Sequence, residues 1–279
     1  MKNPIVTLAL LWAFTSMNAQ KINPAGALTP SMLRQIEQSQ PSSSAEKALR
    51  NAAASNNIDD LAKNSSHQGA VDAYFSIETP RQNIQDQRSS GRCWMFSGLN
   101  VLRANFAKAH NDSMRVEFSQ AYLFFYDQME KANFMLQNVI DNAGKPIDDP
   151  RVQYFFKSPI NDGGTFCGVA DLADKYGLVP MSVMPETYSS DNTKVISRLI
   201  SSKLREFGLE LRRMVTARKK ADAIIKRKTE MLGTIYNMLV MTMGEPVKTF
   251  TYAFCDKNGK PTGPSRTYTP RQFYEATVG

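Results

Sequence analysis

The chain has 279 residues, 42% of them hydrophobic, which is enough for one large domain or two modest ones with a buried core. The formal net charge is +8, but residues 198–230 hold eleven Lys or Arg against four Asp or Glu, so one segment carries almost the whole excess. This concentration argues against a generally basic surface that coats nucleic acid. Three cysteines and two histidines are too few and too scattered for a disulfide framework or a zinc site, and no pattern indicates a cofactor or a metal.

Residues 1–19 have the pattern of a secretory signal peptide. Lys2 provides a short positive start, and an apolar run of ten residues, 5–14, follows it. That run is far shorter than the roughly 20 residues that a membrane-spanning helix needs. We expect cleavage after Ala19 and export to the periplasm or the medium, with an uncleaved N-terminal anchor as the alternative. No later segment is long and apolar enough to span a bilayer.

Residues 20–66 are rich in Ala, Ser, Asn and Gln and predict an N-terminal arm. A helix start at Thr29-Pro30 precedes a short helix over 31–36, and a second helix is expected over 45–54. The alternative is a loosely ordered arm. Residues 73–77 then predict a short strand.

The segment from Gln87 to Ser97 reads Gln-Arg-Ser-Ser-Gly-Arg-Cys-Trp-Met-Phe-Ser. It predicts a loop that ends where a helix begins, with the thiol of Cys93 at the helix N-terminus. The free N–H groups and the positive end of the helix dipole there favour a thiolate, which is the nucleophilic form. The alternative is a structural cysteine at the start of a core helix, but the full string with Gln87 favours a nucleophile.

These residues resemble the active-site loop of papain-type cysteine peptidases. The resemblance implies that Cys93 attacks the carbonyl carbon and that Gln87 donates a hydrogen bond in the oxyanion hole. The signature Cys-Gly-Ser/Ala-Cys-Trp/Tyr appears here as Ser90-Gly91-Arg92-Cys93-Trp94. Ser90 replaces the first cysteine, so the disulfide that papain and the cathepsins form there is impossible. The whole unit is most similar to the bleomycin hydrolase and aminopeptidase C branch.

The resemblance implies an α+β fold of the papain-like cysteine peptidase type, with residues 67–192 as the helical half of the catalytic domain. Aromatic residues over 116–135 predict a core helix, and residues 166–176 predict another. Between them, Gly163 and Gly164 match the Asn-x-Gly-Gly stretch that in this family lies opposite the cysteine and pairs with a bound peptide. By themselves two glycines indicate only a turn. With Trp94, they are the candidate substrate-binding residues.

Residues 193–245 predict two or three helices, because Gly208 and Gly233 interrupt a long helical pattern with a basic face. We weigh three interpretations of that face. It is a solvated surface, a subunit contact, or a site for nucleic acid or another anion. The resemblance favours the subunit contact over nucleic acid, because the family has a helical hook here that meets neighbours in a hexameric ring, and so implies a homo-oligomer.

Residues 246–279 predict a strand over 249–254, a hairpin turn at 256–259, a returning strand over 266–269 and a new helix that starts at Thr269-Pro270. The resemblance identifies this region as the start of a β and helix region that is cut short. The sequence leaves open whether Cys167 and Cys255 form a disulfide.

A thiol peptidase of this type needs an imidazole beside the sulfur and an amide or carboxylate that orients it. His110 lies 17 residues after Cys93 in one expected helix, about 25 Å away at 1.5 Å per residue. His67 precedes Cys93 by 26 residues, and nothing in the sequence indicates that it approaches the thiol. The resemblance therefore implies that the histidine, the asparagine and most of the β half lie downstream of residue 279 or are encoded elsewhere.

The resemblance thus implies a fragment of a cysteine-type aminopeptidase that acts on peptides, and we expect the isolated chain to hydrolyse aminoacyl substrates negligibly. Two alternatives from other classes remain at this point. One is a non-catalytic assembly module or pseudo-enzyme, and the other is a nucleic-acid-binding protein built on the basic helices.

Overall fold

The computed structural model describes residues 26–67, 72 and 74–278, so the expected signal peptide over 1–19 lies outside the described residues. The chain divides into two compact units, Met1–Phe75 and Ser76–Gly279. Among the helices of the described part, none combines the length and the apolar character needed to cross a membrane.

The described part of the first unit is helical. It contains α2 (Pro30–Gln38), α3 (Ser44–Ser55), α4 (Ile58–Leu61) and the short 3₁₀ turn η2 (Ser65–His67). Thr29 accepts a hydrogen bond from the Met32 N–H at the start of α2, and Ser43 forms a capping box with Glu46 at the start of α3. None of the residues in α2, α3 or α4 is buried, so local caps and helix propensity hold these elements. The two helices expected in the arm are confirmed.

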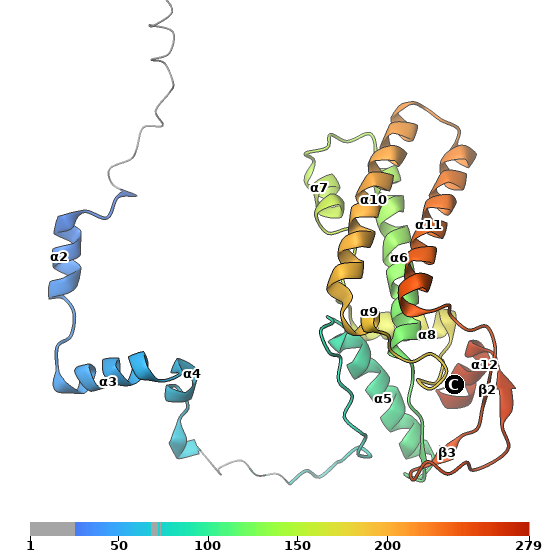
Figure 1. Ribbon diagram of the computed structural model, residues 1–279, viewed down its shortest axis with the longest axis horizontal. Coiled ribbons are helices and arrows are strands. Elements are labelled where there is room, and N and C mark those ends of the chain that lie inside the picture. Colours follow the sequence, from blue (N-terminus) through green and yellow to red (C-terminus); the bar gives the residue numbers. More distant parts are fainter. Residues whose placement is uncertain (1–25, 68–71, 73, 279) are drawn as a thin grey trace, which may run out of the picture. The chain divides into compact units, whose positions relative to one another are not determined.

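The second unit is organised around α6 (Gln120–Asp141), which packs against α10 (Thr193–Thr216) and α11 (Ala221–Met243). The three long helices lie side by side in Figure 1, with the short α7 (Pro150–Lys157) next to them. Apolar residues that recur at helical spacing fill the space between the long helices; they include Leu123, Met135, Leu204, Leu211, Ile235 and Leu239.

The glycines expected to interrupt the 193–245 region lie instead inside continuous helices. The break between α10 and α11 falls at residues 217–220, where Arg218 has a φ of +52°. Gly208 is kept within α10 because a Cβ there would lie 3.1 Å from the ring of Phe156. Tertiary packing therefore outweighs the cost of about 1 kcal/mol that a helical glycine carries relative to alanine.

The predicted nucleophile Cys93 lies at the N-terminal end of α5 (Cys93–Ala109). This helix packs against α8 (Phe166–Tyr176). Gly98 allows the close contact, since a Cβ at that position would lie 2.7 Å from the side chain of Val169. The helix predicted over 166–176 is confirmed residue for residue.

Two small antiparallel sheets complete the unit. β2 (Phe250–Tyr252) pairs with β4 (Arg266–Tyr268), which confirms the predicted hairpin, and β1 (Met114–Arg115) pairs with β3 (Cys255–Asp256), which was not expected. Helix α12 (Pro270–Thr277) starts with a capping box at Thr269, as predicted. It buries Phe273 in an aromatic cluster, whose other members are Phe118, Phe250, Tyr252, Phe254 and Tyr268.

The strand predicted over 73–77 is wrong. Its described residues, 74–77, have no strand partner, and Tyr74 and Ile77 are 81% and 87% exposed. An apolar run becomes a strand only where a neighbouring strand satisfies its backbone groups, and sequence pattern alone does not reveal the neighbour. The described part of the chain is mostly helical, with four strands of two or three residues each.

Candidate active site

Cys93 is the first residue of α5, and its thiol is exposed. Arg92 precedes it at the N-cap with φ −92° and ψ 18°, and its side chain makes no capping hydrogen bond to the helix. The first N–H groups of a helix have no acceptor within the helix, and they form the positive end of its dipole. The thiol thus lies where a negative charge on sulfur, or on an oxygen bound beside it, is stabilised.

Gln87 and Cys93 belong to one internally bonded loop. The Gln87 side-chain amide donates to the Ser90 carbonyl oxygen at 2.8 Å, and the Ser90 hydroxyl donates back to the Gln87 carbonyl oxygen at 2.7 Å. The amide nitrogen of Gln87 carries a second hydrogen that the Ser90 bond does not use. Ser90, which stands where the papain signature has a cysteine, therefore holds the loop by hydrogen bonds instead of a disulfide.

Arg92 anchors this loop from inside the protein. Its side chain is fully buried and pairs with both carboxylate oxygens of Glu186, at 2.8 and 3.1 Å. Its Nε donates to the Ser90 hydroxyl at 2.9 Å, and its guanidinium lies 5.2 Å from the ring centroids of Phe96 and Phe124. A buried charge is tolerated when it is paired, and Glu186 provides that partner. Arg92 Nη2 makes no hydrogen bond to the described residues and lies 3.9 Å from the Asp191 carboxylate.

Asp162 contacts the same loop from the other side. Its carboxylate accepts the Gly91 N–H at 2.9 Å and a hydrogen bond from the Thr193 hydroxyl. Its main-chain oxygen accepts the indole N–H of Trp94 at 2.6 Å. The residue before the predicted glycine pair is thus bonded to residues on both sides of Cys93.

The two predicted substrate-binding glycines have different environments. The N–H of Gly163 donates to the Asn161 side chain at 2.9 Å, and its carbonyl oxygen accepts from Lys131 Nζ at 2.7 Å. Gly164 is exposed and packs closely against the indole of Trp94, where an added Cβ would lie 2.5 Å from the ring. Gly164 is therefore the better candidate for main-chain pairing with a peptide, and the buried Trp94 forms its support.

Lys131 and Asp127 hold this glycine stretch against α6. Lys131 Nζ bonds to Asp127 at 2.8 Å and to the Asn161 carbonyl oxygen at 2.8 Å, and it lies 5.6 Å from the Trp94 ring. Burial raises the pKa of the Asp127 carboxyl above its ordinary value, and the nearby Lys131 ammonium only partly opposes this.

A protein-family model described as the Peptidase C1-like family matches residues 27–279. The chain belongs to the peptidase C1-like family. Aminopeptidase C of Lactobacillus delbrueckii subsp. lactis is 37% identical over 229 residues, which are 82% of this chain and 51% of that protein. Bleomycin hydrolase of Rattus norvegicus is 36% identical, over 79% of this chain and 49% of that protein.

A crystal structure of PepW from Lactobacillus rhamnosis HN001 superposes with a TM-score of 0.84 at 33% identity, covering 91% of this chain and 57% of that one. The resemblance to the bleomycin hydrolase and aminopeptidase C branch is thereby confirmed, and the described part corresponds to a portion of the papain-like fold. The chain spans about half the length of the curated relatives it matches.

Of the chain's two histidines, only His110 belongs to the same unit as Cys93, and it does not lie next to the thiol. His110 caps the opposite end of α5, with Nδ1 2.8 Å from the Phe106 carbonyl oxygen, about 25 Å of helix away from the thiol. His67 is the last residue of η2, in the other unit.

In the described residues, no group of three His, Cys, Asp or Glu side chains is arranged to hold a metal ion. Cys167 and Cys255 do not pair, because all three cysteines are free thiols.

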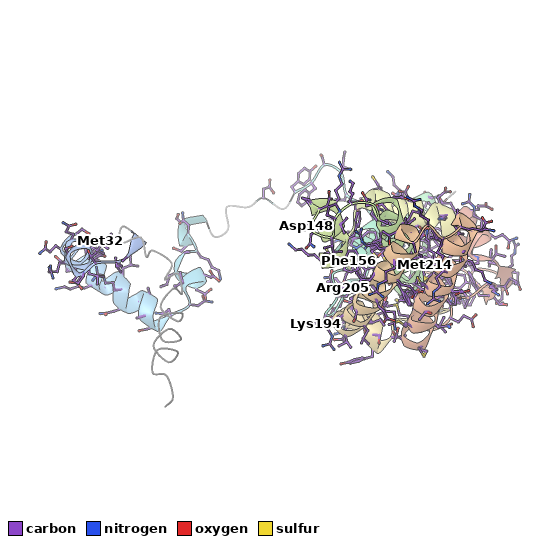
Figure 2. The ribbon with its side chains drawn as sticks, turned by 90° about the horizontal axis from the view of Figure 1, so that it is seen from above. Met32, Asp148, Phe156, Lys194, Arg205 and Met214 are labelled. Atoms are coloured by element: carbon purple, nitrogen blue, oxygen red, sulfur yellow. The ribbon has the colours of Figure 1, made fainter. Side chains whose placement is uncertain are left out.

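Several basic residues of α10 and α11 bind protein groups. Arg205 donates to the Phe156 carbonyl oxygen at 2.7 Å, and Figure 2 shows the two residues close together. Arg212 donates to the Asn142 carbonyl oxygen at 3.0 Å, and Arg227 pairs with Glu210 at 2.6 Å. These contacts explain part of the basic composition as helix packing and give the nucleic-acid interpretation no support.

The sequence missed Arg92, Glu186, Asp162 and Lys131 as site residues. Arg92 lies inside the motif, yet its partner Glu186 is 94 residues away. No signal in the sequence reveals this ion pair, because the burial of Arg92 is a property of the folded chain.

Proposed function

We propose that Cys93 is the nucleophile of a cysteine peptidase that removes residues from the N-termini of peptides. The observation that carries this proposal is an exposed thiol at the start of α5, in a loop that Gln87, Ser90, Arg92 and Asp162 hold by hydrogen bonds. The name of the relative aminopeptidase C supports the aminopeptidase specificity.

In the proposed reaction, Cys93 Sγ attacks the carbonyl carbon of the scissile bond. The Cys93 main-chain N–H and the free hydrogen of the Gln87 amide stabilise the oxyanion. The exposed Gly164 pairs with the peptide main chain, while Trp94 and Lys131 fix the position of the glycine stretch. Protonation of the leaving amine requires an imidazole beside the sulfur, and His110 is out of reach for this step.

The first test is site-specific alkylation of the purified chain. A peptidyl chloromethyl ketone forms a bond between sulfur and its methylene carbon and releases chloride. We expect this reagent to modify Cys93 faster than Cys167, which is also exposed and lies in the first turn of α8, as measured by mass spectrometry of the cleaved peptides. Equal rates at the two thiols would argue that Cys93 is an ordinary surface cysteine.

The second test is hydrolysis. We expect the 279-residue chain to release negligible product from an aminoacyl fluorogenic substrate, because no histidine of its own unit is within reach of the thiol. Clear turnover that disappears in Cys93→Ala would show that the chain supplies a general base after all.

We also propose export through residues 1–19 and self-association through the hook-like residues 193–245. The pattern of Lys2 and the apolar run supports the first, and the resemblance of the helical hairpin to the family's hook supports the second. N-terminal sequencing after expression with export machinery tests cleavage after Ala19, and sedimentation velocity tests the oligomer.

A further inference from the structure

Residue 162 is bonded to the chain on both sides of the proposed nucleophile. Its carboxylate accepts the N–H of Gly91, two residues before Cys93, at 2.9 Å. Its main-chain oxygen accepts the indole N–H of Trp94, the residue after Cys93, at 2.6 Å. One residue thus fixes the backbone before the thiol and the side chain after it.

The same residue is itself fixed by two long helices. The Thr193 hydroxyl, at the start of α10, donates to its carboxylate, and the Ser197 hydroxyl lies 3.5 Å from the other oxygen. The preceding Asn161 carbonyl oxygen accepts hydrogen bonds from Gln128 at 3.1 Å and from Lys131 at 2.8 Å, both on α6. Asp162 therefore has little freedom to move relative to the helical core.

The contact between the two segments is close. A Cβ on Gly91 would lie 3.0 Å from the Asp162 Cβ, and a Cβ on Gly164 would lie 2.5 Å from the Trp94 ring. Ser90 and the three free thiols show that no disulfide joins these segments. Hydrogen bonds to Asp162 and this close packing are what connect the nucleophile loop to the glycine stretch.

We propose that Asp162 is a positioning residue that sets the distance between Cys93 Sγ and the main chain of Gly164. It touches neither the reacting atoms nor the peptide, and it acts through Gly91, Trp94 and the covalently attached glycines. This inference rests on the proposed function, since it assumes that peptides bind along Gly164. It follows that reactions directed by a bound peptide depend on Asp162, while the reaction of Cys93 with a small reagent does not.

The test compares two alkylating reagents on the full chain. Iodoacetamide needs only an accessible thiol, whereas a peptidyl chloromethyl ketone also needs correct placement of its peptide. The measured quantity is the rate constant of the peptidyl chloromethyl ketone at Cys93 divided by that of iodoacetamide at the same thiol. Cys167 is the internal reference thiol, and circular dichroism confirms that each protein is folded. The variants are Asp162→Ala, Asp162→Asn and Gly91→Ala, and Asp148→Asn is the matched control on an exposed loop.

We expect Asp162→Ala to lower this ratio at least about tenfold, because small misplacements of reacting atoms are costly, while the iodoacetamide rate stays unchanged. Asp162→Asn should restore most of the ratio, since its amide oxygen can still accept from Gly91 and Thr193. Gly91→Ala should lower the ratio by crowding the contact from the loop side while the Asp162 carboxylate is retained, and it keeps the test valid if Asp162→Ala does not fold. Asp148→Asn should behave as the unsubstituted chain.

A ratio unchanged in both Asp162→Ala and Gly91→Ala would overturn the inference while leaving the proposed function intact. An equal fall of both rates would also overturn it, because that pattern would mean that Asp162 acts on the reactivity of the thiol itself and not on the placement of the peptide. If the unsubstituted chain shows no preference of the peptidyl reagent for Cys93 over Cys167, the proposed function itself fails and the inference fails with it.

Discussion

Arg92 carries its charge in a fully buried position directly before Cys93. Burial of an unpaired guanidinium is strongly unfavourable, so its bonds to Glu186 and Ser90 are needed for the loop to fold as observed. The side chain thus connects the nucleophile loop to the segment that leads into α9 (Tyr188–Asp191).

Replacement of Arg92 by Met should lower the free energy of unfolding by about 3 kcal/mol, because it leaves the mostly buried Glu186 carboxylate without its partner. Denaturant unfolding measures the change. Arg227→Met is the matched control, since Arg227 pairs with Glu210 and Glu230 at the surface, and we expect its effect to stay within about 1 kcal/mol. Equal effects of the two substitutions would contradict the structural role assigned to Arg92.

The buried Asp127 carboxyl should make stability depend on pH in a defined direction. Burial raises its pKa in the folded state, with Lys131 opposing, so the folded chain keeps this proton to higher pH than the unfolded chain does. Its contribution to stability must then fall as pH rises from near the ordinary value of 3.8 through the raised folded pKa.

We therefore expect the unfolding free energy of the natural chain, relative to Asp127→Asn, to decrease with rising pH across that window. Parallel denaturant titrations of the two proteins at several pH values measure this difference. An increase with pH would mean that Lys131 outweighs burial and that the folded pKa is lowered.

Gly164 is the position where an added methyl group is least tolerated near the site. Its Cβ would lie 2.5 Å from the Trp94 indole, so Gly164→Ala must displace the ring or the glycine stretch. We expect a loss of about 1–3 kcal/mol of stability and a lower rate with the peptidyl chloromethyl ketone. Gly144→Ala, where no atom lies within 4 Å of the added Cβ, should change neither.

At this scale, the local motif was sufficient to predict Cys93 and Gln87 as neighbours in one loop at a helix start. Asp162, Glu186 and Lys131 were not predictable as its partners. Their separation from the motif ranges from tens of residues to 94 in the sequence, and hydrogen bonds over such distances depend on how the helices pack.

Among the elements, α10 and α11 show why glycine is an ambiguous signal. Each contains one interior glycine, and each continues through it. A Cβ added at Gly208 would lie 3.1 Å from the Phe156 ring, whereas a Cβ added at Gly233 would have no atom within 4 Å. Packing therefore crowds the first position and leaves the second open.

Gly233→Ala should therefore stabilise the protein by about 0.5–1 kcal/mol, the helix-propensity difference between the two residues. Gly208→Ala should give no such gain, because its methyl group crowds Phe156. Thermal or denaturant unfolding of the two variants provides the comparison. A destabilised Gly233→Ala would indicate a contact of that helix face with another subunit.

Helices with strong caps and helical periodicity were predictable from the sequence, α8 and α12 among them. The pairing of β1 with β3 was not, because each strand has two residues and the pair joins segments about 140 residues apart. The strand predicted over 73–77 is wrong for a related reason, because an apolar pattern does not show whether a neighbouring strand is present to pair with it.

In the whole molecule, the described residues of the unit that contains Cys93, the proposed nucleophile, place no imidazole beside its thiol. The chain also matches only about half the length of aminopeptidase C and bleomycin hydrolase. We therefore propose that Cys93 and Gln87 belong to a peptidase site whose general base does not come from the described residues of their own unit.

The most direct test is a chimera that joins this chain to the part of Lactobacillus delbrueckii aminopeptidase C that the match leaves uncovered. We predict that the folded chimera hydrolyses aminoacyl fluorogenic substrates, that Cys93→Ala abolishes the hydrolysis, and that Cys167→Ser does not. Hydrolysis that persists in the Cys93→Ala chimera would contradict it. So would a folded but inactive chimera, assayed beside the active intact aminopeptidase C.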